Sequence, residues 1–349
     1  MNIIIKQINN PNDWDNFIKE QEYTLFVQSY KYGEFFKLMN EDYWIFGIYD
    51  NQKLIGGSLI LSTHAKRGNF LYLPYGPLVI EPYLKDLEII LKSFFQELKI
   101  FAKNKNYSFI KCTPFLEDSN ENKNIFNNLG FKNSPLHILA ENTWILSLDK
   151  SEEQLLKEMN KNHRNLIRRC EREGVRIEKL KEPNQAALAK FNQLLDITAK
   201  RHHFQRFSQK YVNNEYQAFI KDQKVIIYNA YLPDGQLDAS AIIFYYQNMA
   251  AYRHGASLGL NKKLPTTYLL QWEAIKEARQ RGCDYYNFWG IAPENADKKH
   301  PFFGITHFKK GFGGFAKDLI HCQDLPLSWK YQITWLVDTF RRIKRGFSY

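Results

Sequence analysis

The chain has 349 residues, of which 44% are hydrophobic and 15% aromatic, so it can bury one large core or two of ordinary size. Its formal net charge of +11 predicts attraction to polyanions, whether nucleic acid, anionic lipid or a diphosphate. No run of eighteen uncharged apolar residues occurs, which excludes a membrane-spanning helix, and we expect no signal peptide because the first residues lack its basic and apolar stretches.

The four cysteines are scattered along the chain: Cys112, Cys170, Cys283 and Cys322. They form no Cys-x-x-Cys pair, and no histidine cluster has metal-ligand spacing. This pattern predicts reduced core residues of a cytoplasmic protein rather than a disulfide or zinc framework. We therefore expect neither a metal nor a cofactor.

The first half of the chain predicts three antiparallel strands, then a helix and one more strand. Residues 45–61 form a hairpin around a polar turn, and residues 69–80 form the third strand. An amphipathic helix covers roughly 83–105, and a short buried strand follows at 107–112.

A strongly basic helix is predicted over residues 151–174. Ser151 and Gln154 match a capping box at its start, and Gly174 is placed to end it. One face is a continuous basic stripe, consisting of Lys157, Lys161, Arg164, Arg168 and Arg172. The buried face holds Leu156, Met159, Ile167 and Cys170. A stripe of one sign favours contact with RNA phosphates, although a solvated helix face is the alternative.

The second half of the chain repeats the order of the first. A hairpin with a Pro-Asp-Gly turn covers 226–246, a third strand 249–257, a helix 264–282 and a buried strand 283–291. Three antiparallel strands, a helix and a further strand form the core of the acyl-CoA N-acyltransferase (GNAT) fold. The sequence therefore predicts an α+β protein made of tandem GNAT-like domains, each a mixed and mostly antiparallel sheet flanked by helices.

We expect a first domain over 1–145, a second over 146–316 and a C-terminal segment over 317–349 that packs back on the first domain. Enzymes of this fold that use acetyl-CoA hold its pyrophosphate on a glycine-rich loop before the helix that follows the third strand. The corresponding residues here, 74–84 and 257–268, lack the required glycine pattern. This argues against an acetyl-CoA enzyme.

Residues 285–314 hold an unusual lysine pair. A buried strand is predicted over Tyr285–Trp289, and an aromatic run later brackets Lys309 and Lys310 between Phe308 and Phe312. Such a setting directs at least one ammonium towards a structured surface. The alternative is an edge strand whose lysines extend their charged ends into water.

The C-terminal segment ends in a helix with an apolar stripe and a basic end. The stripe consists of Trp329, Ile333, Leu336, Phe340 and Ile343, and the basic end of Arg341, Arg342, Lys344 and Arg345. Cations suit the negative end of a helix, so one interpretation is a helix packed on the first domain. The other is contact with an anionic membrane surface, and the two are compatible.

Four segments together resemble the FemA/FemX family of peptidoglycan bridge-forming aminoacyltransferases: 26–37, 67–78, 143–175 and 286–314. The resemblance implies transfer of an amino acid from aminoacyl-tRNA to the stem-peptide amine of lipid II or UDP-MurNAc-pentapeptide. It implies a cytoplasmic enzyme with peripheral contact at the inner face of the plasma membrane. Arg201 leaves no room for the helical hairpin inserted in some members, which resembles the compact FemX type.

The resemblance also implies roles for individual residues. Lys309 is the catalytic residue, as an ammonium that stabilises the oxyanion; a general base is less favoured because an exposed lysine is protonated near pH 7 unless it is strongly desolvated. Arg206 would grip a diphosphate through its fork geometry, the alternative being a surface loop arginine. The implied substrate-binding residues are Phe308, Arg206, Tyr211, Tyr252, Lys37 and His254. The basic stripe becomes a weak tRNA-binding surface.

Some positions depart from the family pattern. His254 stands where a FemX-type enzyme has a tyrosine, and Phe36 takes the place of a phosphate-gripping lysine, with Lys37 one residue on. Thr113 replaces an acidic residue, which removes a candidate base and favours assistance by the substrate itself. Two rival functions stay open: an N-acyltransferase with another activated acyl donor, and a non-catalytic RNA- or lipid-binding protein of the same fold.

Overall fold

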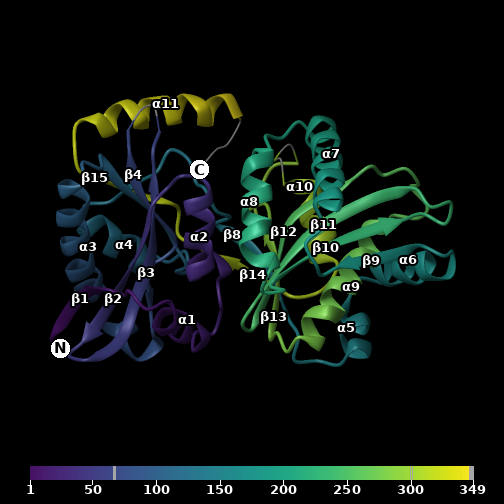
Figure 1. Cartoon of the computed structure of the whole chain (residues 1–349), viewed down its shortest axis with the longest axis horizontal. Coiled ribbons are helices and arrows are strands. Elements are labelled where there is room, and N and C mark those ends of the chain that lie inside the picture. The colour runs from purple at the N-terminus through teal and green to yellow at the C-terminus, as the bar shows by residue number, and fades with distance from the viewer. Residues whose placement is uncertain (66–67, 299, 301, 346–349) are drawn as a thin grey trace. The chain divides into compact units, whose positions relative to one another are not determined.

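The computed structural model describes residues 1–65, 68–298, 300 and 302–345 (Figure 1). Arg67 of the segment 67–78, Lys299 and Pro301 of the segment 286–314 and the last four residues of the C-terminal segment lie outside the described residues. The chain divides into two compact units. One consists of Met1–Asn142 together with Lys317–Tyr349, and the other of Thr143–Ala316.

The first unit is built on a sheet with the strand order β1-β2-β3-β4-β6-β15-β7, with β5 paired to β3. Its strands are β1 (Ile3–Gln7), β2 (Tyr43–Asp50), β3 (Lys53–Thr63), β4 (Phe70–Tyr75), β5 (Leu78–Val79), β6 (Phe109–Pro114), β7 (Lys132–Asn133) and β15 (Gln323–Pro326). Its helices are α1 (Pro11–Lys19), α2 (Tyr30–Leu38), α3 (Leu87–Asn104), α4 (Asn120–Asn128) and α11 (Lys330–Arg345). Side chains alternate across β2, so Trp44 and Phe46 pack into the core that contains α3 while Tyr43 contacts Tyr30 of α2.

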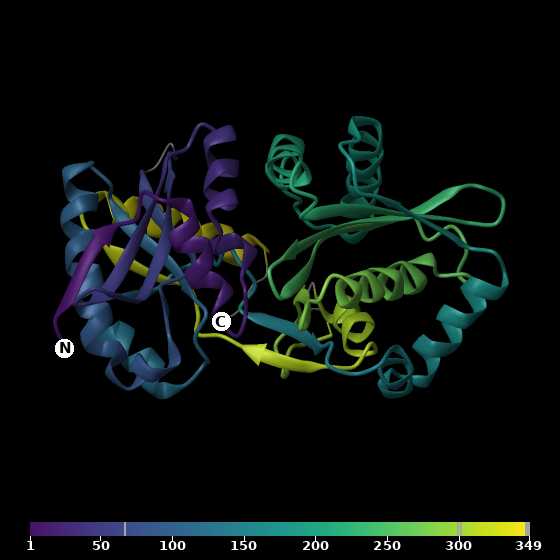
Figure 2. The same cartoon turned by 60° about the horizontal axis from the view of Figure 1, so that its bottom comes forward.

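The second unit contains a sheet with the order β14-β8-β13-β12-β11-β10-β9. Its strands are β8 (Asn142–Ser147), β9 (Arg176–Leu180), β10 (Val225–Tyr231), β11 (Leu237–Tyr246), β12 (Met249–Ser257), β13 (Tyr285–Gly290) and β14 (Phe315–Asp318). Its helices are α5 (Glu152–Glu158), α6 (Lys161–Arg172), α7 (Gln185–His202), α8 (Gln209–Ile220), α9 (Thr266–Gln280) and α10 (Phe303–Lys310). Figure 2 shows α7 and α8 on one face of this sheet and α9 on the other.

Both sheets contain the predicted repeat. In each, a hairpin and a third antiparallel strand lead through a helix to a strand that pairs in parallel with the third: β4 pairs with β6 through α3, and β12 with β13 through α9. Two faces of β11 are covered, because Ile243 and Tyr245 belong to the core with α9 while Phe244 packs on Phe219 of α8. The structure confirms the tandem α+β, GNAT-like fold. The four cysteines are buried and free, as predicted.

The prediction of one basic helix over 151–174 is wrong, because two helices occupy this stretch. Ser151 and Gln154 form the predicted capping box at the start of α5, but the chain becomes extended at Met159. The side chain of Asn160 then caps α6, and its backbone N–H donates to the carbonyl of Gly311 over 2.8 Å. This second contact is tertiary, so the helical periodicity of the sequence carried no sign of the break.

Residues around the lysine pair form the helix α10 and not an edge strand. The C-terminal helix α11 lies across one end of the first sheet (Figure 1). It packs through Tyr331 and Thr334, whereas the apolar stripe predicted from the sequence faces outward, with Phe340 79% exposed. Of the helices that the structure describes, none combines the length and the apolar composition needed to cross a membrane.

Candidate active site

The pairing of β12 with β13 stops partway along both strands. Parallel pairing runs from Met249 opposite Tyr285 to Ala251 opposite Asn287 and goes no further. Beyond that point the register of β13 against β8 shifts, and Trp289 adopts a φ of 65° while its N–H donates to Oδ1 of Asn287 over 2.7 Å. A positive φ is uncommon for a residue other than glycine and is frequent at functional sites.

Lys309 lies where the two strands part. Its Nζ donates a 2.5 Å hydrogen bond to the carbonyl of Gly290, at the end of β13, and lies 5.9 Å from the ring centroid of Tyr252 on β12. The side chain is only 5% exposed. Burial lowers the pKa of Lys309 to about 7, since no carboxylate among the described residues compensates its charge. Lys309 is therefore a strongly desolvated lysine, and the argument that an exposed lysine stays protonated near pH 7 does not apply to it.

Contacts from both sides fix the helix that carries Lys309. His163 of α6 donates from Nε2 to the carbonyl of Phe308 over 2.9 Å. Gly311 makes room for this imidazole, because a Cβ at that position would overlap the ring. On the other side, the hydroxyl of Thr306 accepts from the N–H of Ala292 over 2.8 Å. Helix α10 is thus tied through its backbone to α6 and through the Thr306 side chain to the turn that follows β13.

The ring of Phe308 packs inward against the aromatic side chains of the second unit. Its centroid lies 5.0 Å from that of Tyr268 and 5.3 Å from that of Phe312. Phe308 was predicted to bind substrate, and the structure gives its ring a packing role that orients α10. Lys310, the other member of the pair, is exposed and lies over the ring of Trp144.

A buried ionic cluster brings together two more predicted residues, Tyr211 and His254. Glu215 is completely buried and accepts from Nε of Arg253 over 3.1 Å and from Nε2 of His254 over 2.6 Å. Arg253 also donates to the hydroxyl of Tyr211 over 3.2 Å, and its guanidinium lies 5.0 Å from the ring centroid of Trp289. The cluster therefore connects α8, β12 and the strained end of β13.

Charges within this cluster compensate one another. Burial alone would raise the pKa of Glu215, but Arg253 and His254 hold it below its usual value. Burial lowers the pKa of His254 in spite of the neighbouring carboxylate. A neutral His254 that donates to an ionised Glu215 is consistent with the lowered pKa of each residue.

Arg206 lies in the loop between α7 and α8 and already has protein partners. Its Nη1 is 2.8 Å from Oδ1 of Asp196 and donates to the carbonyl of Asn192 over 2.9 Å. Its Nε donates to the carbonyl of Phe207 over 2.8 Å. A diphosphate at Arg206 would have to replace or share these acceptors.

Lys37 belongs to the first unit, near the end of α2. It is 57% exposed, its Nζ lies 3.3 Å from Oε1 of Glu34, and it stands over the ring of Tyr43. Its neighbour Phe36 packs on the ring of Phe35, so the register of α2 gives the two residues distinct environments.

The predicted basic stripe is divided between α5 and α6, and its residues differ in their contacts and exposure. Arg164 donates from Nη1 to the carbonyls of Leu156 and Lys157 and so caps the end of α5. Arg172 pairs with Glu173 over 3.0 Å. Lys161 and Arg168 lie exposed on α6.

Several residues of the candidate site and of the buried ionic cluster were not predicted from the sequence, namely His163, Glu215, Arg253, Asn287 and Thr306. A signal was present for Glu215, since it occupies the buried face of α8 at helical spacing with Val212, Tyr216 and Phe219. A polar Asn287 in a buried strand was another such signal, and its Nδ2 has no hydrogen-bond partner among the described residues. For His163, nothing in the local sequence indicated the contact with Phe308.

Comparison with known proteins gives a consistent result. A model of the FemAB family matches residues 10–238 and 230–338. A lipid II:glycine glycyltransferase of Staphylococcus haemolyticus is 22% identical over 302 residues, which cover 66% of this chain and 71% of that protein. The enzyme of the same description from Staphylococcus aureus is 22% identical over 304 residues, with the same coverage.

Solved structures agree with the fold. The crystal structure of FemX superposes with a TM-score of 0.80 at 18% identity, covering 97% of this chain and 100% of that one. The structure of L-PGS from Bacillus licheniformis gives a TM-score of 0.55 at 15% identity, covering 95% and 96% of the two chains. At these identities the likeness establishes the fold.

Proposed function

This chain belongs to the FemAB family, and we propose that it is an aminoacyltransferase that moves an amino acid from aminoacyl-tRNA to the stem-peptide amine of a peptidoglycan precursor. The observation that carries the proposal is Lys309, a buried lysine without an acidic partner among the described residues, at the point where β12 and β13 part. The relatives named as lipid II:glycine glycyltransferases support lipid II as the acceptor.

The reaction needs a proton carrier at the acceptor amine. The amine attacks the ester carbonyl of the donor, a C–N bond forms, and the ester C–O bond breaks to release the ribose hydroxyl. Neutral Lys309 takes the proton from the attacking nitrogen and, as an ammonium, returns it to the departing oxygen. A pKa of about 7 suits both steps at neutral pH, because such a group is readily protonated and deprotonated.

The same ammonium serves the tetrahedral intermediate. Once protonated, Lys309 stands as a fixed donor beside the developing oxyanion, where loss of one such donor typically slows a reaction by about 10²–10³. Its bond to the carbonyl of Gly290 holds the nitrogen in place before substrate arrives. The structure thus supports a base role beside the oxyanion role expected from the sequence.

Support for a polyanionic donor comes from α6 and from the net charge. Lys161 and Arg168 lie exposed on the same helix that holds α10 through His163. Phosphates neutralised there would release counterions and make donor binding salt-dependent. For the acceptor, Tyr252 of β12 stands beside Lys309. The cluster of Tyr211 and His254 joins α8 to the same strand.

The test is transfer of radiolabelled amino acids from a charged total-tRNA pool. Lipid II and UDP-MurNAc-pentapeptide are offered separately, with Lys309→Ala and the exposed neighbour Lys310→Ala alongside. We expect label on lipid II, loss of that label in Lys309→Ala, and its retention in Lys310→Ala. No transfer to either acceptor, together with product from labelled acetyl-CoA on a peptide amine, would refute the proposal.

A further inference from the structure

The outward face of α11 is apolar, the reverse of what a helix on a protein surface normally presents. Four side chains of α11 form this outward stripe, namely Ile333 (44% exposed), Leu336 (59%), Phe340 (79%) and Ile343 (68%), and Trp329 (72%) extends it just before the helix. At 3.6 residues per turn they fall within an arc of about 80°. Single exposed apolar residues are ordinary, but a continuous exposed stripe marks an interaction surface.

The opposite face of α11 is held to the first unit by a buried polar network. Tyr331 is 1% exposed, its ring packs on Phe109, and its hydroxyl donates to Oδ2 of Asp324 over 3.1 Å. Asp324 in turn pairs with Nζ of Lys111 over 2.8 Å, and Lys111 donates to the hydroxyl of Ser134. The helix cannot roll its apolar stripe inward without breaking this chain of contacts.

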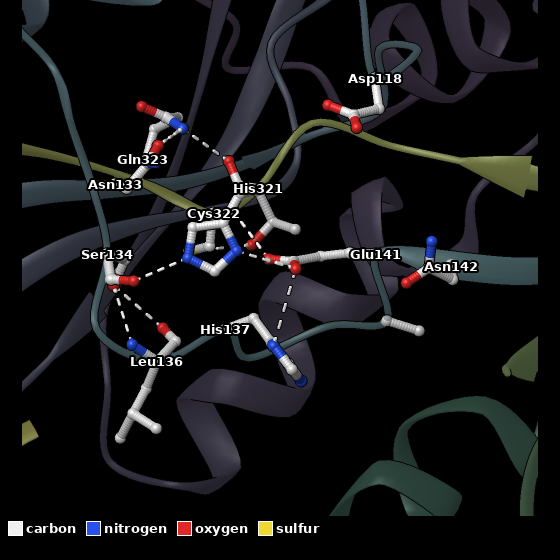
Figure 3. Close-up of polar contacts among 12 residues, drawn as sticks. Asp118, Asn133, Ser134, Leu136, His137, Glu141, Asn142, His321, Cys322 and Gln323 are labelled. Atoms are coloured by element: carbon white, nitrogen blue, oxygen red, sulfur yellow. Dashed lines mark hydrogen bonds and ion pairs between the residues drawn. The ribbon is translucent and has the colours of Figure 1, made fainter. Parts of the chain in front are cut away.

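The network continues past Ser134 to His321 and Cys322, the two residues directly before β15, the strand that leads to α11 (Figure 3). His321 donates from Nε2 to the carbonyl of Ser134 over 2.7 Å, and its Nδ1 lies 2.9 Å from Oε2 of Glu141. The other carboxylate oxygen of Glu141 accepts from the N–H of Cys322 over 2.7 Å. These bonds hold the chain that enters β15, and Tyr331 joins α11 to that strand, so the outward orientation of the stripe follows from the packing of the first unit.

The charges of α11 indicate what covers the stripe. Lys330, Arg341 and Lys344 flank it on one side, and Asp338 is the single acidic residue of the helix. Arg341 is half-exposed and lies 3.6 Å from Asp338. Apolar residues bordered by cations are the pattern of a helix that lies in the plane of an anionic membrane surface.

We propose that α11 binds an anionic lipid bilayer through this stripe, with its axis parallel to the membrane and its basic flank at the headgroups. A second copy of the chain fits less well, because pairing two such helices brings their basic flanks together. RNA would meet the cations and leave the stripe uncovered. This membrane-binding role follows from the geometry of α11 and does not depend on the proposed reaction.

The experiment is flotation of the full chain with vesicles of phosphatidylcholine and phosphatidylglycerol at 3:1, compared with vesicles of phosphatidylcholine alone. We expect binding to the anionic vesicles that weakens with salt. Leu336→Glu should weaken it at least about ten-fold, because burial of one such side chain contributes that much or more. The matched control is Ile89→Glu on α3, where the native side chain is 60% exposed, and it should bind as the native chain does.

The basic flank is tested separately. The double variant Lys330→Gln/Lys344→Gln should lose roughly five-fold per lysine on anionic vesicles, the affinity equivalent of one cation near such a surface. Far-UV circular dichroism and thermal unfolding check that each variant is folded. Absence of flotation, or equal flotation of Leu336→Glu, overturns the proposal. The proposal is also overturned if the native chain forms a dimer in sedimentation velocity and Leu336→Glu abolishes that dimer but still binds the vesicles. Because the assay needs neither donor nor acceptor, its failure is distinct from failure of the proposed transfer reaction.

Discussion

The imidazole of His163 donates a 2.9 Å hydrogen bond to the backbone carbonyl of Phe308, the residue before Lys309, although the two are 145 positions apart in the chain. The other ring nitrogen, Nδ1, is buried and has no hydrogen-bond partner among the described residues. This bond is one of the contacts by which α6, which carries the exposed cations, holds the helix that carries the candidate catalytic lysine.

Removing this bond should reduce turnover more than substrate binding. We expect His163→Ala to lower kcat by about ten-fold or more, because a misplaced reactive group loses much of its effect, while KM changes little. His163→Gln, which can still donate, should recover part of the loss. A proportionate fall in folded protein with unchanged kcat per folded molecule would indicate a purely structural role.

Gly311→Ala tests the same contact from the other side. A Cβ at Gly311 would overlap the His163 ring, so the ring must move and its bond to Phe308 must break. We expect a loss of about 1–3 kcal/mol in the free energy of unfolding, typical of overpacking, measured by urea denaturation. Gly304→Ala on α10, where an added Cβ meets nothing within 4 Å, is the control and should change stability little.

The pH dependence of transfer separates the two roles of Lys309. Its pKa is lowered to about 7, so the neutral form predominates above that pH. If the neutral amine is the base, the pH profile of kcat/KM has an inflection near pH 7 in addition to the one that the acceptor amine contributes, and the residual activity of Lys309→Met lacks the inflection near pH 7. A rate that falls above pH 7 would instead assign Lys309 only as an ammonium. Lys309→Arg, which stays charged, should be inactive in the first case and partly active in the second.

Burial of Lys309 also affects stability. Between about pH 7 and the unfolded value of 10.5 the unfolded chain binds one more proton than the folded chain at this residue, so its contribution to stability rises with pH. Lys309→Met should therefore be more stable than the native chain at pH 6–7. The difference should shrink by up to about 1.4 kcal/mol per pH unit above pH 7. The exposed Lys310→Met should show no such trend, and a pH-independent gain in Lys309→Met would contradict the explanation.

Neutralising Glu215 should destabilise the second unit strongly. Glu215→Gln leaves Arg253 buried without its anion, and breaking such a pair costs about 3–5 kcal/mol. Because the pKa of Glu215 is held below its usual value, its contribution is full at neutral pH and is lost as the pH falls through the folded-state value. The unfolding free energies of the two proteins should thus converge in acid. Asp196→Asn, which removes the 68% exposed partner of Arg206, is the control and should cost less than about 1 kcal/mol.

The divided basic stripe predicts different effects for its members. Lys161→Glu/Arg168→Glu should raise KM for aminoacyl-tRNA and lower the slope of its salt dependence by about one for each phosphate that is no longer neutralised. Arg164→Ala should instead reduce stability, since Arg164 caps α5, and leave the salt slope in place. An unchanged KM in the double variant would remove α6 from the donor surface.

Much of the fold followed from short-range features of the sequence. The two hairpins, the crossover helices and the buried strands were predicted within a few residues of their observed bounds, because turn residues and hydrophobic periodicity act over one element at a time. Capping by Ser151 was predicted for the same reason. The repeat of this order then determined the tandem fold.

The sequence by itself thus determined which residue types stand at the candidate site, including the lysine between Phe308 and Phe312. Only the tertiary structure decided that Lys309 is buried, because its environment is made by Gly290, by Tyr252 and, through the backbone of α10, by His163, which come from separate parts of the chain. The same holds for α11. Periodicity identified its apolar stripe, but the outward direction of that stripe depends on Tyr331 and its bond to Asp324, a contact that exists only once β15 is in place beside β6.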